Sequence, residues 1–148
     1  MNRGYCGIGM YSPKTSMNLG TLWRSAYCLG ADFIFTIGDR YKKQCSDTVK
    51  AYRHIPYWRF EDSIDFQKHI PYDCHLVCVE LTESARSLKT FVHPERAIYL
   101  LGPEDGNIPL ELLVKAQHIV RFDSKHCLNV ASAGTVVLYD RQSKAKNF

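Results

Sequence analysis

Short apolar runs rich in β-branched and aromatic residues alternate along this chain with segments of helical periodicity. The runs with the length and composition of strands are 5–10, 32–37, 75–81, 97–101 and 118–122. The apolar residues between the first two recur at the three- and four-residue spacing of one helical face: Leu19, Leu22, Ala26 and Leu29. Strands that alternate with helices predict a mostly parallel sheet with helices on both faces, an α/β fold.

Three further helices are expected along the chain. They are residues 63–69, residues 109–116 with Pro109 at the opening position, and a last helix from Leu128 to about Tyr139. A length of 148 residues fits one domain, so we expect residues 1–148 to form a single unit.

Composition excludes several classes of protein. Hydrophobic residues make up 45% and charged residues 23%, which excludes a disordered or collagen-like chain. The longest apolar run, residues 33–37, is far shorter than the ~20 residues that span a bilayer. The first six residues lack the apolar core of a signal peptide, and the six cysteines include no CxxC pair that suggests zinc. We therefore expect a soluble, cytoplasmic protein with reduced cysteines, no membrane segment and no metal.

Positive charge is concentrated between residues 40 and 59. That segment has six basic residues and one acid, a net charge of +5, whereas the whole chain carries +4. Four rings are interleaved with these charges: Tyr41, Tyr52, Tyr57 and Trp58. Cations that neutralise phosphates, mixed with rings on which bases stack, indicate an RNA-binding segment with Lys42, Lys43 and Arg53 as candidate contacts. The alternative is a solvated, charged loop.

The helix around residues 16–26 has polar residues on its non-core side. Asn18 can cap the start of the helix. Arg24 lies about 200° from Leu22 around the helix, so it projects outward or into a cleft, on the same side as Gly20. Because a helical glycine costs about 1 kcal/mol relative to alanine, Gly20 marks close approach by a ligand or another chain. The alternative is an ordinary surface arginine on an amphipathic helix.

Two later segments also have candidate site residues. A strand ends at Leu101 in a loop rich in Gly and Pro that contains Glu104, at the carboxyl end where ligands bind in open α/β sheets. Further on, Asn129 and Ser132 share one helical face near a helix start. The run 131–134 is made of small residues, so another backbone can approach it closely.

Together, the order and spacing of these segments resemble the three signature motifs of the SpoU (TrmH) branch of the SPOUT RNA methyltransferases. Asn18-x-Gly20-x-x-x-Arg24-x-Ala26 is similar to motif one, and Leu101-Gly102-x-Glu104-x-Gly106 is similar to motif two. Leu128-Asn129-Val130-x-Ser132-Ala133 is similar to motif three. Cys127 stands where many members have serine, which preserves a backbone contact but not a hydroxyl contact.

The resemblance implies a fold, a cofactor and partners. The fold would be a mostly parallel sheet flanked by helices, with a C-terminal trefoil knot, and the chain would form a homodimer. S-adenosylmethionine (SAM) would bind the loops of motifs two and three. The residues expected to contact SAM are Leu81, Leu101, Gly102, Pro103, Gly106, Val120, Cys127 and Leu128.

The implied reaction is methyl transfer to a ribose 2′-hydroxyl of RNA, with tRNA as first choice and ribosomal RNA as second. Arg24 would lie near the cofactor of the facing subunit. Because guanidinium is effectively never deprotonated, we expect Arg24 to hold a phosphate and stabilise charge on the 2′-oxygen rather than act as a base. The other catalytic residues implied, which would fix the loops and orient the ribose, are Asn18, Glu104, Asn129 and Ser132.

Three other interpretations compete with this one. Gly7-Ile8-Gly9 suggests a dinucleotide-binding turn, but Ser12 occupies the third glycine position. Cys127 beside His126 suggests a thiol hydrolase, although adjacent residues seldom point together. The last alternative is a non-catalytic, knotted RNA-binding dimer.

Overall fold

The computed structural model describes residues 4–38, 40 and 54–145. The strands are β1 (Tyr5–Tyr11), β2 (Phe33–Ile37), β3 (Tyr57–Phe60), β4 (His75–Val79), β5 (Arg86–Ser87), β6 (Arg96–Leu101) and β7 (His118–Arg121). The helices are α1 (Ser16–Cys28), α2 (Ser63–Lys68), α3 (Leu110–Leu113) and α4 (Val130–Lys144), with a 3₁₀ turn η2 (Leu88–Thr90).

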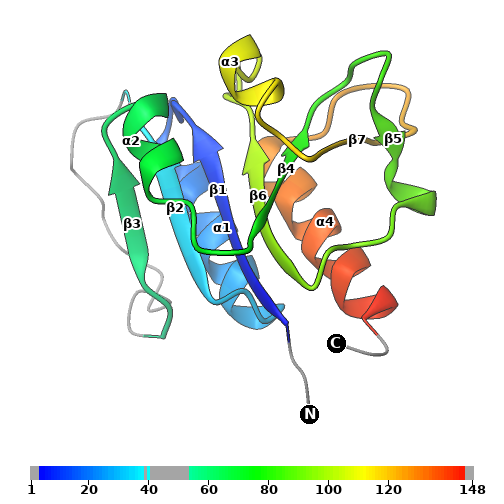
Figure 1. The fold of residues 1–148 in the computed structure, drawn as a ribbon, viewed down its shortest axis with the longest axis horizontal. Helices are drawn as coiled ribbons and strands as arrows, with labels where there is room; N and C mark the ends of the chain where they lie inside the picture. The colour runs from blue at the N-terminus through cyan, green and yellow to red at the C-terminus, as the bar shows by residue number, and fades with distance from the viewer. Residues whose placement is uncertain (1–3, 39, 41–53, 146–148) are drawn as a thin grey trace.

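All strand pairs are parallel, in the order β3-β2-β1-β6-β4-β7-β5. Helices α1 and α4 lie side by side on one face of the sheet, and α2 and α3 lie on the other (Figure 1). The structure confirms the α/β class with a parallel sheet flanked by helices. The trefoil knot stays a prediction.

Each face of the sheet has its own apolar core. In β2 every residue is buried, because its alternate side chains enter opposite cores. Ile34 packs with the α1 and α4 side, and Phe33 and Phe35 pack with the α2 and α3 side. This continuous burial explains why the run reads as apolar without alternation.

Glycines allow close packing at two places. Gly9 lies in the middle of β1 beside Phe35 of β2. A Cβ at this position would lie 2.3 Å from the backbone oxygen of Phe35, so only glycine fits. Gly7 is similarly covered by the ring of Phe33, and because residues 7–9 lie inside β1 they do not form a dinucleotide-binding turn. A Cβ on Gly134 would lie 2.4 Å from Leu22 Cδ1, which confirms that the small run in α4 admits a close neighbour, helix α1.

Two strands and several helix boundaries differ from expectation. β3 lies at the edge of the sheet with Trp58 and Arg59 exposed, and β5 has two residues, so neither forms an apolar run. The last helix begins at Val130 rather than Leu128, because Asn129 is its N-cap. Pro109 likewise precedes α3 as its N-cap.

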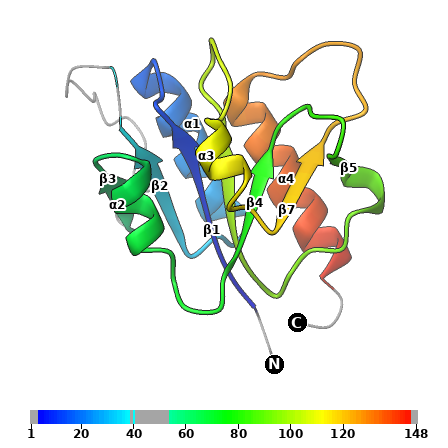
Figure 2. The same ribbon diagram turned by 45° about the horizontal axis from the view of Figure 1, so that its top comes forward.

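The carboxyl ends of all strands meet at one edge, where the long loops gather (Figure 2). Among the described residues, no helix has the length and apolar character that a bilayer crossing requires. The expected RNA contacts Lys42, Lys43 and Arg53 lie outside the described residues.

Candidate functional site

A cavity of about 680 Å³ opens at the carboxyl ends of β4, β6 and β7, beside the start of α4. Motifs two and three form its walls. Seven of the eight residues expected to contact SAM line it: Leu81, Leu101, Gly102, Pro103, Gly106, Cys127 and Leu128. The structure therefore brings these residues together, although 20 or more positions separate the three segments from which they come.

Val120 is the eighth residue and does not line the cavity. Its side chain is 1% exposed and packs in the core between the sheet and α4. Its carbonyl accepts a hydrogen bond from the Glu80 backbone at 3.0 Å. Because strand residues alternate between the two faces of the sheet, the side chain of Val120 points into the core, and contact with SAM through its main chain stays a prediction.

Side chains from the three motifs form one chain of hydrogen bonds at the edge of the cavity. Asn129 Nδ2 donates to Asn18 Oδ1 at 3.1 Å, and Asn18 Nδ2 donates to Glu104 Oε1 at 2.9 Å. A carboxylate only accepts, which fixes the direction in which both amides point. The sequence separations of 111 and 86 residues show that this chain joins distant parts of the molecule.

Glu104 is the end of this chain. Its other oxygen accepts from the Lys14 backbone N–H at 2.8 Å. Partial burial raises the pKa of Glu104, but the hydrogen bonds from Asn18 and Lys14 outweigh burial and leave the pKa below its usual value. Glu104 is therefore an ionised acceptor that ties the motif-two loop to the loop between β1 and α1.

Asn18 does not cap α1, contrary to expectation. The N-cap residue is Thr15, without a side-chain bond, and Asn18 lies three positions later. Its amide instead bridges Glu104 and Asn129. Asn18 is therefore the third residue of the helix, and its side chain makes a tertiary contact.

Asn129 is the N-cap of α4. Its Oδ1 accepts from the backbone N–H of Ala131 at 3.0 Å and of Ser132 at 3.2 Å. Ser132 is exposed on the first turn of α4, as its shared face with Asn129 predicts. Asn129 therefore connects the positive end of a helix to the hydrogen-bond chain that ends on Glu104.

Arg24 is exposed on α1, as the helical periodicity predicts. It is not among the residues that line the cavity, whereas Glu104 and Asn129 are. Within one chain, Arg24 therefore stands outside the site.

Sequence reasoning missed several residues of the cavity. Glu80 lines it, and its Oε2 accepts from the Ile108 backbone N–H at 2.9 Å, which holds the far side of the motif-two loop. Its position directly after β4 was an available signal, since ligands bind at strand carboxyl ends. The end of β7 adds the basic side chain of Arg121, and the loop between β7 and α4 adds those of Lys125 and His126. Among residues 4–38, 40 and 54–145, no three His, Cys, Asp or Glu side chains gather as a metal site.

Solved structures with the same fold cover nearly the whole chain. An AdoMet-bound rRNA methyltransferase from Sinorhizobium meliloti matches with a TM-score of 0.81 and 24% identity over 98% of this chain. The SpoU methyltransferase AviRb from Streptomyces viridochromogenes, in complex with AdoMet, matches with a TM-score of 0.84 and 19% identity over 97%. This chain spans 58% and 59% of the length of those two proteins.

A third structure, described as giving insights into the 2-OH methylation of C/U34 on tRNA, matches with a TM-score of 0.82 and 18% identity. The match covers 99% of this chain and 94% of that one. At these identities the likeness establishes the fold.

No protein of curated function matches the sequence. The sequence pattern of the SpoU rRNA methylase family, however, matches residues 6–139, which contain all three motifs and every residue that lines the cavity. This chain belongs to the SpoU rRNA methylase family.

Proposed function

We propose that this chain transfers a methyl group from SAM to a ribose 2′-hydroxyl of RNA, with tRNA as the first candidate substrate. The observation that carries the proposal is the hydrogen-bond chain Asn129–Asn18–Glu104, which unites the three family motifs beside the cavity. Such a chain holds loops from three parts of the sequence in one arrangement, as a site for two substrates requires.

The cavity suits SAM in size and chemistry. Its volume of about 680 Å³ lies within the ~300–1,000 Å³ of small-molecule sites. Apolar walls from Leu81, Leu101 and Leu128 suit an adenine ring. The acid Glu80 and the bases Arg121 and Lys125 suit a ligand that carries a sulfonium, an ammonium and a carboxylate.

When bound, SAM supplies a methyl group already activated on a sulfonium. The protein then has to align a 2′-hydroxyl with that methyl group and stabilise negative charge on the oxygen as its proton leaves. Asn18, Glu104 and Asn129 keep the loops in register, and Ser132 on the exposed first turn of α4 is available to orient the ribose. Arg24 holds the adjacent phosphate and stabilises the charge on the 2′-oxygen.

Arg24 meets this site only in a dimer. The outer face of α1 and α4 exposes the apolar side chains Met17, Tyr27, Val136 and Tyr139, and Arg24 lies seven residues after Met17 on the same helix. We infer that a second copy packs on this face, where the two copies bury these side chains. Each Arg24 then reaches the cavity of the facing subunit.

Two considerations support tRNA and a cytoplasmic setting. The tRNA-related structure is a neighbour that this chain spans almost completely. The described cysteines are all unpaired, which suits a reducing compartment. Ribosomal RNA is the second candidate, because the family and the longer Sinorhizobium meliloti neighbour are described by activity on rRNA.

The test is transfer of labelled methyl from SAM to purified tRNA and, separately, to ribosomal RNA, followed by mapping of 2′-O-methyl marks. We expect a mark on tRNA that disappears from cells lacking this chain. Marks on ribosomal RNA alone would show that ribosomal RNA, rather than tRNA, is the substrate. RNA binding without any transfer would favour a non-catalytic dimer and overturn the proposal.

A further inference from the structure

Arg40 joins two loops at the edge of the cavity. Its guanidinium makes a two-pronged ion pair with Asp105, with Nη2 2.7 Å from Oδ1 and Nη1 3.0 Å from Oδ2. Nε and Nη2 of the same group also donate to the Ser12 carbonyl, at 3.2 and 3.0 Å. One side chain therefore spans the end of β1 and the loop between β6 and α3.

The Arg40 and Ser12 side of this bridge is held in place by backbone hydrogen bonds. The Arg40 backbone N–H donates to the Pro13 carbonyl at 3.1 Å. Ser12 has a φ of 45°, a conformation uncommon outside glycine, and its N–H donates to the Ile37 carbonyl at 2.8 Å. The Ser12 carbonyl is thus a fixed acceptor, so Arg40 approaches Asp105 from a defined position.

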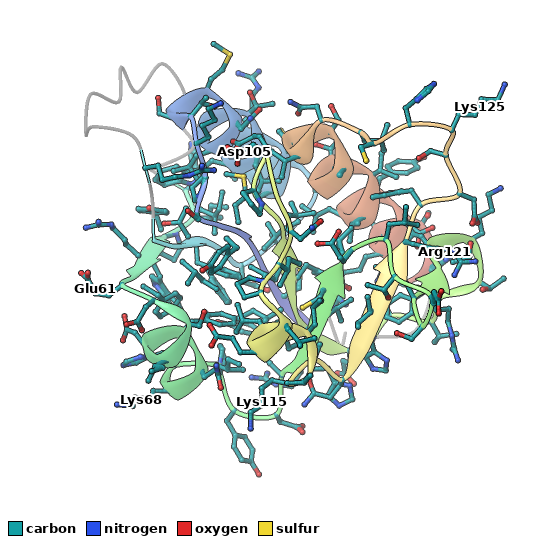
Figure 3. All side chains as sticks on the ribbon, turned by 90° about the horizontal axis from the view of Figure 1, so that it is seen from above. Glu61, Lys68, Asp105, Lys115, Arg121 and Lys125 are labelled. Atoms are coloured by element: carbon teal, nitrogen blue, oxygen red, sulfur yellow. The ribbon has the colours of Figure 1, made fainter. Side chains whose placement is uncertain are left out.

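Asp105 lies between two residues that line the cavity, Glu104 and Gly106, but does not line it itself. Viewed toward the carboxyl edge of the sheet, Asp105 is at the tip of its loop, between α1 and α4 (Figure 3). The hydrogen bonds from Arg40 hold the pKa of Asp105 below its usual value. Its carboxylate is therefore used to anchor the loop, while its neighbours face the ligand.

We propose that Arg40, through Asp105, is a positioning residue for the cofactor-binding loop and raises the affinity of the cavity for SAM. The loop is then fixed on one side by Arg40 and by Asn18 with Lys14, and on the other by Glu80. Arg40 is the first residue of the basic segment 40–59. Its charge pairs with Asp105 of the cofactor-binding loop, whereas Lys42, Lys43 and Arg53 remain the candidates for RNA contact. The inference rests on the proposed use of SAM.

The test is calorimetric SAM binding by the full chain and by the variants Arg40→Ala, Asp105→Asn and the double variant. An exposed, two-pronged ion pair predicts about fivefold weaker binding in each single variant. The double variant should bind no more weakly than Arg40→Ala, because Asp105→Asn removes a link that Arg40→Ala has already removed. The difference in SAM affinity between the parent and the variants should become smaller as salt rises from about 0.1 M to about 1 M, because the Debye screening length falls from about 10 to about 3 Å.

Arg96→Ala is the matched control. Arg96 also donates twice to a backbone carbonyl, that of Tyr72, but at the opposite end of β6. Its loss should leave SAM affinity unchanged. If Arg40→Ala does not fold, Asp105→Asn keeps the side-chain size and removes the charge and one of the two acceptor oxygens.

SAM affinity equal to the parent in folded Arg40→Ala or Asp105→Asn would overturn this inference, as would losses that add in the double variant. A parent chain that does not bind SAM would instead overturn the proposed function.

Discussion

Arg24 is the residue on which the proposed chemistry depends most, and it contributes little to the fold. It is exposed on α1, so Arg24→Ala should change stability by no more than about 0.5 kcal/mol. If it stabilises developing charge, its loss should slow methyl transfer by about 10²–10³-fold. Arg24→Lys should restore little, because an ammonium lacks the planar, two-pronged grip on phosphate. Single-turnover transfer with SAM and RNA both saturating is the measurement.

SAM binding is the control for these variants, since the cavity is lined by other residues. Both variants should bind SAM as the parent does. Transfer at the parent rate by Arg24→Ala would show that Arg24 is a bystander.

At the scale of elements, the contact between α1 and α4 positions motifs one and three. Gly134→Ala adds a Cβ 2.4 Å from Leu22 and 2.9 Å from Leu101, both fully packed in the core. Overpacking of this kind costs about 1–3 kcal/mol, and better helix propensity returns about 1 kcal/mol. We expect a net loss of about 1 kcal/mol in the free energy of unfolding, measured with urea. Gln142→Ala, an exposed change on the same helix, should have no such effect.

The C-terminal half of α4 is held by a buried histidine, which makes stability depend on pH. His93 bonds to the Tyr99 hydroxyl and to Asp140 Oδ2, each at 2.7 Å. Burial lowers the pKa of His93 below its usual value, although Asp140 partly offsets this. The unfolded chain therefore binds the His93 proton more tightly than the folded chain does. The free energy of unfolding is not reduced by this group above about pH 6.5, and it falls as the pH drops toward the lowered pKa.

Urea unfolding between about pH 7.5 and about pH 5 checks this dependence. His93→Gln should be less stable at neutral pH and should show a shallower loss toward acid. Some slope should remain, because burial also lowers the pKa of His118. A parent chain equally stable across this range would contradict the prediction.

At the scale of the whole molecule, the proposed site uses two copies of the chain. Val136→Glu places a charge in the exposed apolar face of α1 and α4, so we expect a monomer by sedimentation at micromolar concentration. This variant should bind SAM and fail in transfer, because Arg24 no longer reaches a partner. Ile64→Glu, at a more exposed apolar position on α2, should stay dimeric and active. A monomeric parent would refute the arrangement.

The amino-acid sequence by itself determined features that depend on nearby residues. Strand runs and helical periodicity indicated the α/β class, and the spacing of Leu19, Leu22 and Ala26 was enough to predict that Arg24 faces outward. The three motifs identified the family because their residue types and order are local facts. The edge strands β3 and β5 were not predicted, because short or half-exposed strands contain no apolar run.

Only the tertiary structure decided which distant side chains meet. Asn18 was expected to cap its own helix, but the order of strands in the sheet brings it to Glu104 and Asn129. Val120 was expected to contact SAM through its main chain or as an apolar wall, and only the structure shows that its side chain enters the core. The pairing of Arg40 with Asp105, 65 residues apart, had no signal in the sequence. Hydrogen bonds between loops depend on which strands are neighbours, and that is settled by the packing of the whole sheet rather than by any local run of residues.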